Sequence, residues 1–141
     1  MNDRISDFAR SIGIATSGLK AQAGRMRVIS ENIANADSTA KTPGGDPYRR
    51  KVPTFSTELD RNLDARVVTL GRVRQDQSAF RVRNDPSNPA ADANGNVKLP
   101  NVNSVVEMSD LREAQRSYEA NLNIIGATRR MIQRTLDILK A

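Results

Sequence analysis

Paired carboxylates are the residues of this chain that come nearest to a catalytic arrangement. Glu58 and Asp60 are two positions apart, and Asp110 and Glu113 are three positions apart. Two neighbouring carboxyl groups can serve as general acid and general base when their surroundings separate their pKa values. Both pairs lie on polar stretches among cations, where a solvated surface is the usual role of such groups. We therefore expect neither pair to be catalytic.

Composition excludes most other active sites. The 141 residues include no Cys and no His, so thiolate nucleophiles, disulfides, imidazole acid–base chemistry and the common zinc ligands cannot be built. We expect no catalytic residue, no metal site and no cofactor. The chain is predicted not to be an enzyme.

Two loops resemble ligand-binding motifs but lack their required residues. In the stretch "DPSNPAADANGN", residues 85–96, placing Gly95 at the invariant glycine of a calcium loop puts Ala90 at the first ligand position and Asn101 at the last. An EF-hand needs acidic residues at these two positions. The pair Gly44-Gly45 is not followed by Lys-Ser/Thr or by a predicted helix, so it is a turn rather than a phosphate-binding loop.

The positive charge raises the possibility of a nucleic-acid-binding protein. Lys and Arg number 22 against 16 Asp and Glu, a net charge of +6. Residues 49–51 are Arg-Arg-Lys beside Tyr48, and Arg81 and Arg83 share one side of a predicted strand, so phosphate contacts with stacking are feasible. No nucleic-acid-binding signature accompanies them, and no cationic block precedes the amino-terminal heptads as in a basic zipper. We therefore expect no nucleic acid partner. A basic nucleic-acid-binding coiled coil is kept as the alternative function.

The amino-terminal segment has the heptad spacing of a coiled-coil helix. Apolar residues alternate in steps of three and four over four heptads, with one polar position, Gln22. The seam consists of Ile5, Phe8, Ile12, Ala15, Leu19, Gln22, Met26, Ile29 and Ile33. This spacing predicts a long helix that packs against another helix.

The carboxy-terminal segment repeats this spacing. Its seam consists of Met108, Leu111, Gln115, Tyr118, Leu122, Ile125, Arg129, Ile132, Leu136 and Leu139. A second apolar set, Ile124, Met131 and Ile138, runs beside the seam at intervals of seven. The apolar arc of this helix is therefore wider than a single partner helix covers.

Between the two helices, residues 36–104 contain all six prolines and four of the eight glycines. Short β-like stretches occur at 51–56, 66–70, 79–83 and 97–99. An ordinary helical hairpin needs no connection of this length. The predicted fold is mainly α, with long terminal helices in a coiled-coil-like unit and a small β-rich, loop-rich insert. We expect residues 1–36 to pair with 105–141 as an assembly unit, with 37–104 as the insert.

The stretch "ISENIANADSTAKTPGGDPYRRK", from Ile29 to Lys51, resembles the amino-terminal signature of flagellar rod and hook proteins. In that family Asn-Ile-Ala-Asn closes a long helix before a loop that ends in Tyr and basic residues. The matching positions here are Asn32, Ile33, Ala34, Asn35, Tyr48, Arg49 and Arg50. The long spacer 38–47 is similar to the FlgC-type branch of the flagellar basal-body rod family, the proximal rod proteins.

The carboxy-terminal half carries the same resemblance. "LPNVNSVVEMSDLREAQRSYEANLNIIGATRRMIQRTLDIL", residues 99–139, is similar to the Pro-Asn-Val-Asn, Glu-Met and Arg-Ser-Tyr-x-Ala-Asn elements of that branch. The matching positions are Asn101, Asn103, Glu107, Met108, Arg116, Tyr118 and Asn121. The resemblance spans nearly the whole chain, although residues 51–77 carry little of it.

The resemblance implies a non-enzymatic structural subunit of the proximal rod, the drive shaft of the bacterial flagellar basal body. It implies export without a cleaved signal peptide by the flagellar type III apparatus and assembly in the periplasm. The expected partners are other rod and basal-body proteins, further copies of the chain, and the export apparatus. The longest apolar run near the start, 12–15, is too short for a secretory signal or a membrane span, so we expect no membrane insertion.

The Asn-Ile-Ala-Asn motif itself allows two interpretations. Asn35 and the polar residues after it can end the helix, as such side chains commonly do, or the motif can contact a neighbouring subunit. Asn32 falls beside the seam, whereas Gln22, Gln115 and Arg129 lie on the seams. Polar seam residues fix helix register in coiled coils, so these three are the better register candidates.

Overall fold

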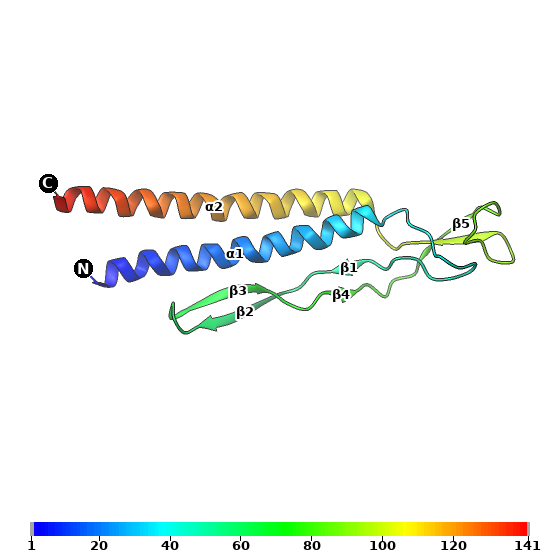
Figure 1. The fold of residues 1–141 in the computed structure, drawn as a ribbon, viewed down its shortest axis with the longest axis horizontal. Coiled ribbons are helices and arrows are strands. Elements are labelled where there is room, and N and C mark those ends of the chain that lie inside the picture. The colour runs from blue at the N-terminus through cyan, green and yellow to red at the C-terminus, as the bar shows by residue number, and fades with distance from the viewer. Residues whose placement is uncertain (1, 141) are drawn as a thin grey trace. The chain divides into compact units, whose positions relative to one another are not determined.

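The computed structural model describes residues 2–140, and their side chains from Ser6 onward. The described chain begins with α1 (Asn2–Ala34) and ends with α2 (Ser104–Lys140), and short strands occupy the region between them (Figure 1). The two long terminal helices and the small β-rich insert between them, both predicted from the sequence, are confirmed, and about half of the chain is helical. No helix within the described residues is both long and apolar enough to cross a membrane.

Local side-chain bonds define the helix ends. At the end of α1, Asn35 donates from its side-chain amide to the carbonyl of Glu31, and the Ser38 hydroxyl donates to the carbonyl of Asn35. At the start of α2, the Asn103 side-chain oxygen accepts the backbone N–H groups of Val105 at 3.1 Å and Val106 at 3.4 Å. Asn103 is therefore an N-cap, which satisfies amides that the helix itself leaves unpaired.

Within residues 2–140 the strands form three antiparallel pairs: β1 (Lys51–Val52) with β4 (Arg74–Gln75), β2 (Phe55–Asp60) with β3 (Ala65–Leu70), and β5 (Arg81–Asn84) with β6 (Asn96–Leu99). Each β-like stretch of the sequence contributes to a strand. The stretch 51–56 is split, because Pro53 has no N–H for a strand ladder and interrupts it between β1 and β2.

Asx-type bonds close the two long turns of the insert. Between β2 and β3, one Asp60 carboxylate oxygen accepts the backbone N–H groups of Asn62 and Leu63. In the loop before β6, one Asp92 oxygen accepts the N–H groups two and four residues later. Gly95 has a φ of +78°, and a Cβ there would lie 2.8 Å from Pro86. The calcium-like loop is thus a self-bonded turn.

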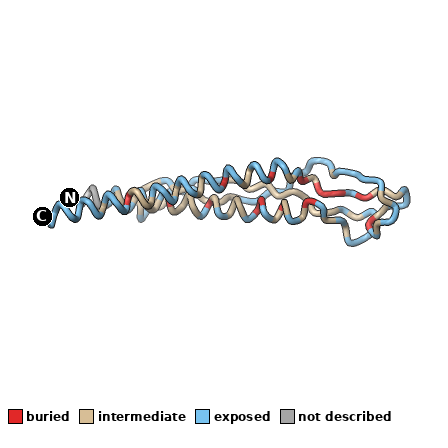
Figure 2. The backbone as a smooth tube through the Cα atoms, turned by 90° about the horizontal axis from the view of Figure 1, so that it is seen from above, coloured by how far each residue is buried: buried red, intermediate tan, exposed pale blue. Residues whose placement is uncertain are grey.

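Unit 1 is one of two compact units of the chain. It comprises the residues up to Met26, Thr54–Arg72 and the residues from Glu113 onward. Small residues mark its helix contacts: Ala15 and Ala21 of α1 are buried, as are Ala114 and Thr128 of α2. Figure 2 shows these buried positions (red) as single residues between partly or fully exposed ones. Small buried side chains allow close helix packing but bury little apolar area.

The hairpin of β2 and β3 packs on α1 within unit 1. A Cβ at Gly13 would lie 2.4 Å from Leu63, and one at Gly24 would lie 2.8 Å from Leu70. Arg10 Nε donates to the carbonyl of Leu63 at 2.9 Å. The two glycines therefore provide the room in which the hairpin leucines sit.

Unit 2 comprises Arg27–Pro53 and Val73–Arg112. Its apolar cluster is formed by the buried residues Ala90, Val97 and Leu99, with Ala40 and Ala91 packed against them. This cluster is small, so polar contacts must contribute much of the cohesion of unit 2.

Candidate assembly site

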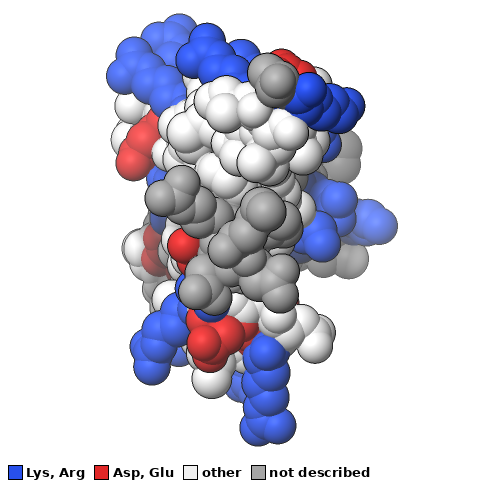
Figure 3. All heavy atoms as spheres, turned by 90° about the vertical axis from the view of Figure 1, so that its left-hand side faces the viewer, with Lys and Arg blue, Asp and Glu red and all other residues white. Residues whose placement is uncertain are grey.

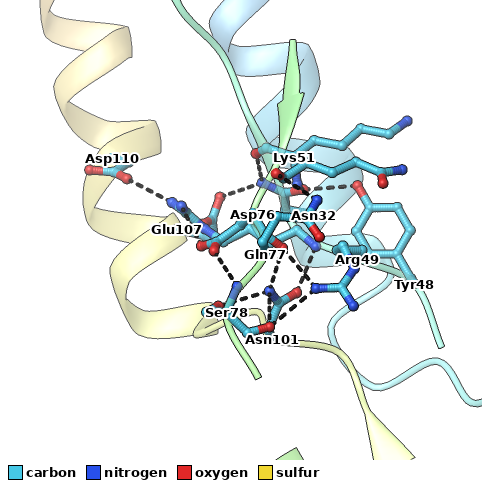
Figure 4. A network of polar contacts seen from close by, with 12 residues as sticks. Asn32, Tyr48, Arg49, Lys51, Asp76, Gln77, Ser78, Asn101, Glu107 and Asp110 are labelled. Atoms are coloured by element: carbon cyan, nitrogen blue, oxygen red, sulfur yellow. Dashed lines mark hydrogen bonds and ion pairs between the residues drawn. The ribbon is translucent and has the colours of Figure 1, made fainter. Parts of the chain in front are cut away.

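A cluster of polar side chains in unit 2 contains many of the motif residues. We call it the motif cluster. It joins the end of α1, the chain entering β1, the chain leaving β4 and the start of α2 (Figure 4). Its members are Asn32, Tyr48, Arg49, Arg50, Lys51, Asp76, Ser78, Asn101, Glu107 and Asp110.

Asn32 is the hub of the motif cluster and is fully buried. Its amide nitrogen donates to the carbonyl of Lys51 at 2.8 Å and to the Glu107 carboxylate at 3.0 Å. Its amide oxygen accepts the Lys51 N–H at 2.9 Å and the Tyr48 hydroxyl at 2.8 Å. An Asn has two donors and one acceptor oxygen, so this environment uses the whole amide group. No hydrophobic residue of similar size could replace it.

Glu107 is the charged centre of the motif cluster and is only 1% exposed. Arg50 Nε donates to its carboxylate at 2.6 Å. The remaining guanidinium nitrogens of Arg50 lie 3.7 Å from Asp76 and 3.9 Å from Asp110. Burial of a carboxylate is costly unless it is paired and hydrogen-bonded. Arg50 and Asn32 together meet that requirement.

Asn101 and Arg49 hold the chain after β4. The Asn101 side-chain oxygen accepts the Arg50 N–H at 2.8 Å, and its nitrogen donates to the carbonyl of Asp76 at 3.0 Å. Arg49 donates to the carbonyls of Asp76 and Ser78 and lies 4.2 Å from the centre of the Phe80 ring. These basic groups are thus engaged within the chain.

Two pKa values in the motif cluster are displaced. The pKa of Asp76 is lowered, first by the Ser78 N–H, then by the Ser78 hydroxyl and the nearby Arg50 and Arg49. Burial, together with the carboxylates of Glu31 and Glu107, raises the pKa of Tyr48 to about 12. Both shifts favour the protonation states that the hydrogen bonds require. The charged and hydrogen-bonding groups of the motif cluster pair with one another, and this arrangement suits a structural role better than proton transfer.

The amino-terminal seam residues with described side chains are partly or fully buried, although the buried residues Ala21, Val28 and Asn32 of α1 lie off the seam. Ile29 is buried, and the side chain of Ile5 lies outside the described residues. The partly buried members are Phe8, Ile12, Leu19, Met26 and Ile33. Gln22 is also partly buried, and its side-chain oxygen has no hydrogen-bond partner among the described residues.

The carboxy-terminal seam is only half covered. Leu111, Tyr118, Ile125 and Ile132 are partly buried, whereas Gln115 and Arg129 are exposed. Four apolar members are 45–59% exposed: Met108, Leu122, Leu136 and Leu139. The second apolar set, which we call the outer stripe, is also exposed: Ile124 at 48%, Met131 at 50% and Ile138 at 76%.

The other motif residues lie outside the motif cluster. Asn35 and Asn103 bond the ends of the two helices. Asn121 donates to the carbonyl of Ser117, one turn earlier on α2. Ala34 and Arg116 are exposed, and the Arg116 side chain adds to the basic groups of α2. In the end view of Figure 3, Lys and Arg side chains project from the periphery of the face drawn.

The carboxylate pairs have contacts that hold the fold. Glu58 accepts the Thr69 hydroxyl across the β2–β3 hairpin at 3.4 Å, while Asp60 closes the turn of that hairpin. Asp110 lies beside Arg50, and Glu113 pairs with Arg25 at 3.4 Å.

Asp76 and Ser78 were not predicted from the sequence, because they lie on an irregular segment where no periodicity indicates a structural role.

In a comparison with known protein families, both ends of the chain match flagellar basal-body rod proteins. Residues 12–40 match the family described as "Flagella basal body rod protein", and residues 93–138 match "Flagellar basal body rod FlgEFG protein C-terminal". The matched segments contain most of the motif residues at both ends. Asn32 and Glu107 fall one in each segment.

Whole-chain relatives agree with these matches. The chain is 54% identical to the flagellar basal-body rod protein FlgC of Agrobacterium fabrum, over 91% of this chain and 92% of the relative. It is 39% identical to FlgC of Salmonella typhimurium, over 89% of this chain and 92% of the relative. It is 38% identical to FlgC of Bacillus subtilis, over 92% of this chain and 97% of the relative.

Proposed function

This chain belongs to the FlgC family of flagellar basal-body rod proteins, and from that premise we propose that it is a subunit of the proximal rod. The family is structural and non-enzymatic, and it places the chain in the flagellar basal body among the other rod components. In our proposal the subunit is exported by the flagellar type III apparatus. It then enters the axial drive shaft through its terminal helices and supports motility.

The observation that carries this proposal is the unmatched apolar surface of α2. Leu122, Leu136 and Leu139 on the seam and the outer stripe are about half or more exposed. Monomeric soluble proteins rarely expose large apolar areas, and large exposed apolar patches mark interaction sites. In a subunit that packs against neighbours along its length, these apolar residues are covered once the neighbours bind.

We further propose that the two terminal helices pair as an assembly unit, with 1–36 against 105–141 and 37–104 as an insert. Contacts within unit 1 support the pairing. Arg25 of α1 lies 3.4 Å from Glu113 of α2, and a Cβ at Gly18 would lie 2.8 Å from the Asn121 amide. Glycine at that position lets the two helices approach closely.

The motif cluster has a different role in this proposal, that of a lock within the subunit. Asn32 is buried and bonded on all sides, so it is accessible to no neighbouring subunit in the folded chain. Asn35 bonds the end of the helix. Of the two interpretations of the motif, we therefore favour internal structure for both Asn residues and leave assembly to the exposed helix faces.

Export and periplasmic assembly suit the limited core of the chain. The apolar cluster of unit 2 consists of Val97, Leu99 and three Ala residues, and the buried helix positions of unit 1 are mostly Ala. A chain with a modest core is unfolded readily for transport. It gains stability when neighbours cover its apolar faces, because folding and binding are then coupled.

The same contacts argue against nucleic acid as a partner. Arg50 is engaged by Glu107, and Arg49 by two carbonyls and Phe80. Arg81 donates to the carbonyls of Pro100 and Ala36. Side chains held in this way are poorly placed for phosphate contacts.

Gene deletion with complementation tests the proposed function. The deletion strain is expected to lack hooks and to lose swimming, and the wild-type gene is expected to restore both. Swimming with normal hooks in the deletion strain would show that the chain is no required rod subunit.

A further inference from the structure

A groove runs between α1 and the β2–β3 hairpin within unit 1. Its volume is about 750 Å³. The apolar part of its lining comes from Gly13 and Ala21 of α1 and from Leu59, Leu63, Val67, Val68 and Leu70 of the hairpin. A groove of this size accommodates several apolar side chains.

The groove faces away from the α2 helix of the same chain. Gly13 and Gly24, which accommodate the hairpin leucines, are eleven residues apart, close to three full helical turns, and so share one side of α1. Gly18, which approaches Asn121 of α2, is five residues after Gly13 and lies roughly 140° around the helix. Of the described residues, the groove lining includes none from α2.

The outer stripe on α2 is an apolar surface that fits this groove. Ile124, Met131 and Ile138 are spaced by seven, so they form one line along the helix that extends for roughly 21 Å. All three are 48–76% exposed. A helix that lays such a line of side chains into an apolar groove is a recurrent mode of recognition.

Charged groups lie beside both surfaces. The groove is lined by the carboxylates of Glu58 and Asp60 and by the cations of Lys20 and Arg61, and Glu58 is exposed. Arg134 is three residues after Met131 and four before Ile138, so it lies beside the outer stripe, and it is exposed. The exposed Glu58 carboxylate can thus pair with Arg134 when the stripe occupies the groove.

We propose that the groove of one subunit receives the outer stripe of a second copy of this chain, with Glu58 facing Arg134 of the neighbour. This inference rests on the proposed function, because it names the contact between copies in the rod. The two surfaces differ, so the contact is heterologous. Such contacts add subunits in an open helical array rather than closing a dimer.

Cysteine cross-linking in assembled basal bodies tests the contact, because the chain has no Cys of its own. Cells produce Leu59→Cys and Met131→Cys subunits together, and the isolated basal bodies are oxidised and analysed under non-reducing conditions. We expect a disulfide-linked dimer of the two variants. Replacing Met131→Cys by Gln133→Cys, on the opposite side of α2, is expected to lower dimer yield at least tenfold. If either variant fails to enter basal bodies, the pair Val67→Cys and Ile138→Cys makes the same test.

A charge exchange provides a second test. Glu58→Arg is expected to reduce the cross-link several-fold, and adding Arg134→Glu to the Met131→Cys subunit is expected to restore it. Basal bodies that contain the chain but yield no such dimer, or a dimer of Met131→Cys subunits alone, would overturn the groove proposal and leave rod membership intact. Absence of the wild-type chain from basal bodies would overturn the proposed function itself.

Discussion

Asn32 on α1 donates a hydrogen bond to the Glu107 carboxylate on α2 across 3.0 Å, although the two residues are 75 positions apart in the chain. Asn32 lies in the segment 12–40 and Glu107 in the segment 93–138, the two segments that match flagellar rod family models. Their contact joins these segments, and each residue supplies a hydrogen-bonding group that the other needs once buried. Because of this separation, forming the contact carries the entropic cost of closing the long stretch of chain between the two residues.

Replacing Asn32 by Ala is expected to destabilise the chain by about 2–4 kcal/mol, because it leaves the Lys51 amide, the Tyr48 hydroxyl and one Glu107 oxygen without partners in a buried site. Urea unfolding monitored by circular dichroism measures this change. Asn35→Ala, in the same motif but with a single local bond, is the control and is expected to cost less than about 1 kcal/mol. Equal losses for the two variants would contradict the role given to Asn32.

The ion pair of Arg50 and Glu107 is expected to show strong coupling in a double-mutant cycle. Glu107→Leu alone leaves the Arg50 charge in a half-buried site with Asp76 and Asp110 at 3.7–3.9 Å, so we expect a loss of about 2–4 kcal/mol. The double variant Arg50→Met/Glu107→Leu is expected to recover a substantial part of it. Additive losses would mean that the two residues act independently.

Tyr48 provides a prediction on pH. Its pKa is raised to about 12, against an ordinary value of about 10, so the folded state favours the neutral phenol. The stabilisation from this group is fully present below pH ~10 and is lost as the pH rises through the folded value. In a Tyr118→Phe variant, Tyr48 is the only tyrosine, and its absorbance near 295 nm should titrate with a midpoint near pH 12. The same variant in urea should titrate near pH 10.

Charge placed on the exposed seam is expected to separate assembly from stability. Leu122 is 52% exposed, so Leu122→Asp should change the stability of the isolated chain by less than about 1 kcal/mol and yet abolish assembly and swimming. Asn123→Asp adds the same charge one position away, on a polar face, and should leave swimming normal. Leu19→Asp, on the partly buried α1 seam, is expected to impair both stability and assembly. A Leu122→Asp strain that swims normally would contradict the assembly surface proposed for α2.

Heptad spacing was enough to predict the long helices, because apolar periodicity is the strongest secondary-structure signal in a sequence. Breaks rich in Pro and Gly were enough to predict the insert. The sequence also predicted strands at residues 66–70 and 97–99. The first stretch lies in β3 and the second in β6. The partner of β3 was only partly foreseen, because Thr57–Asp60 of β2 contains a single apolar residue, Leu59, and therefore has no apolar alternation.

The motif cluster could not be predicted from spacing. Its members come from segments far apart in sequence, and a buried Glu107 has the same local sequence signal as a surface glutamate. Asp76 and Ser78 contribute mainly through a backbone carbonyl and an N–H, which no side-chain pattern reveals. The glycines at 13 and 24 likewise have their reason in the hairpin that lies on them.

The central claim is that this chain is a structural subunit of the flagellar rod. Quantitative mass spectrometry of detergent-washed basal bodies from the native cell tests it most directly. The account predicts that the chain is enriched with the hook and other rod proteins at a fixed ratio across preparations. Its loss to the soluble fraction, while the other rod proteins stay in the basal bodies, would contradict the account.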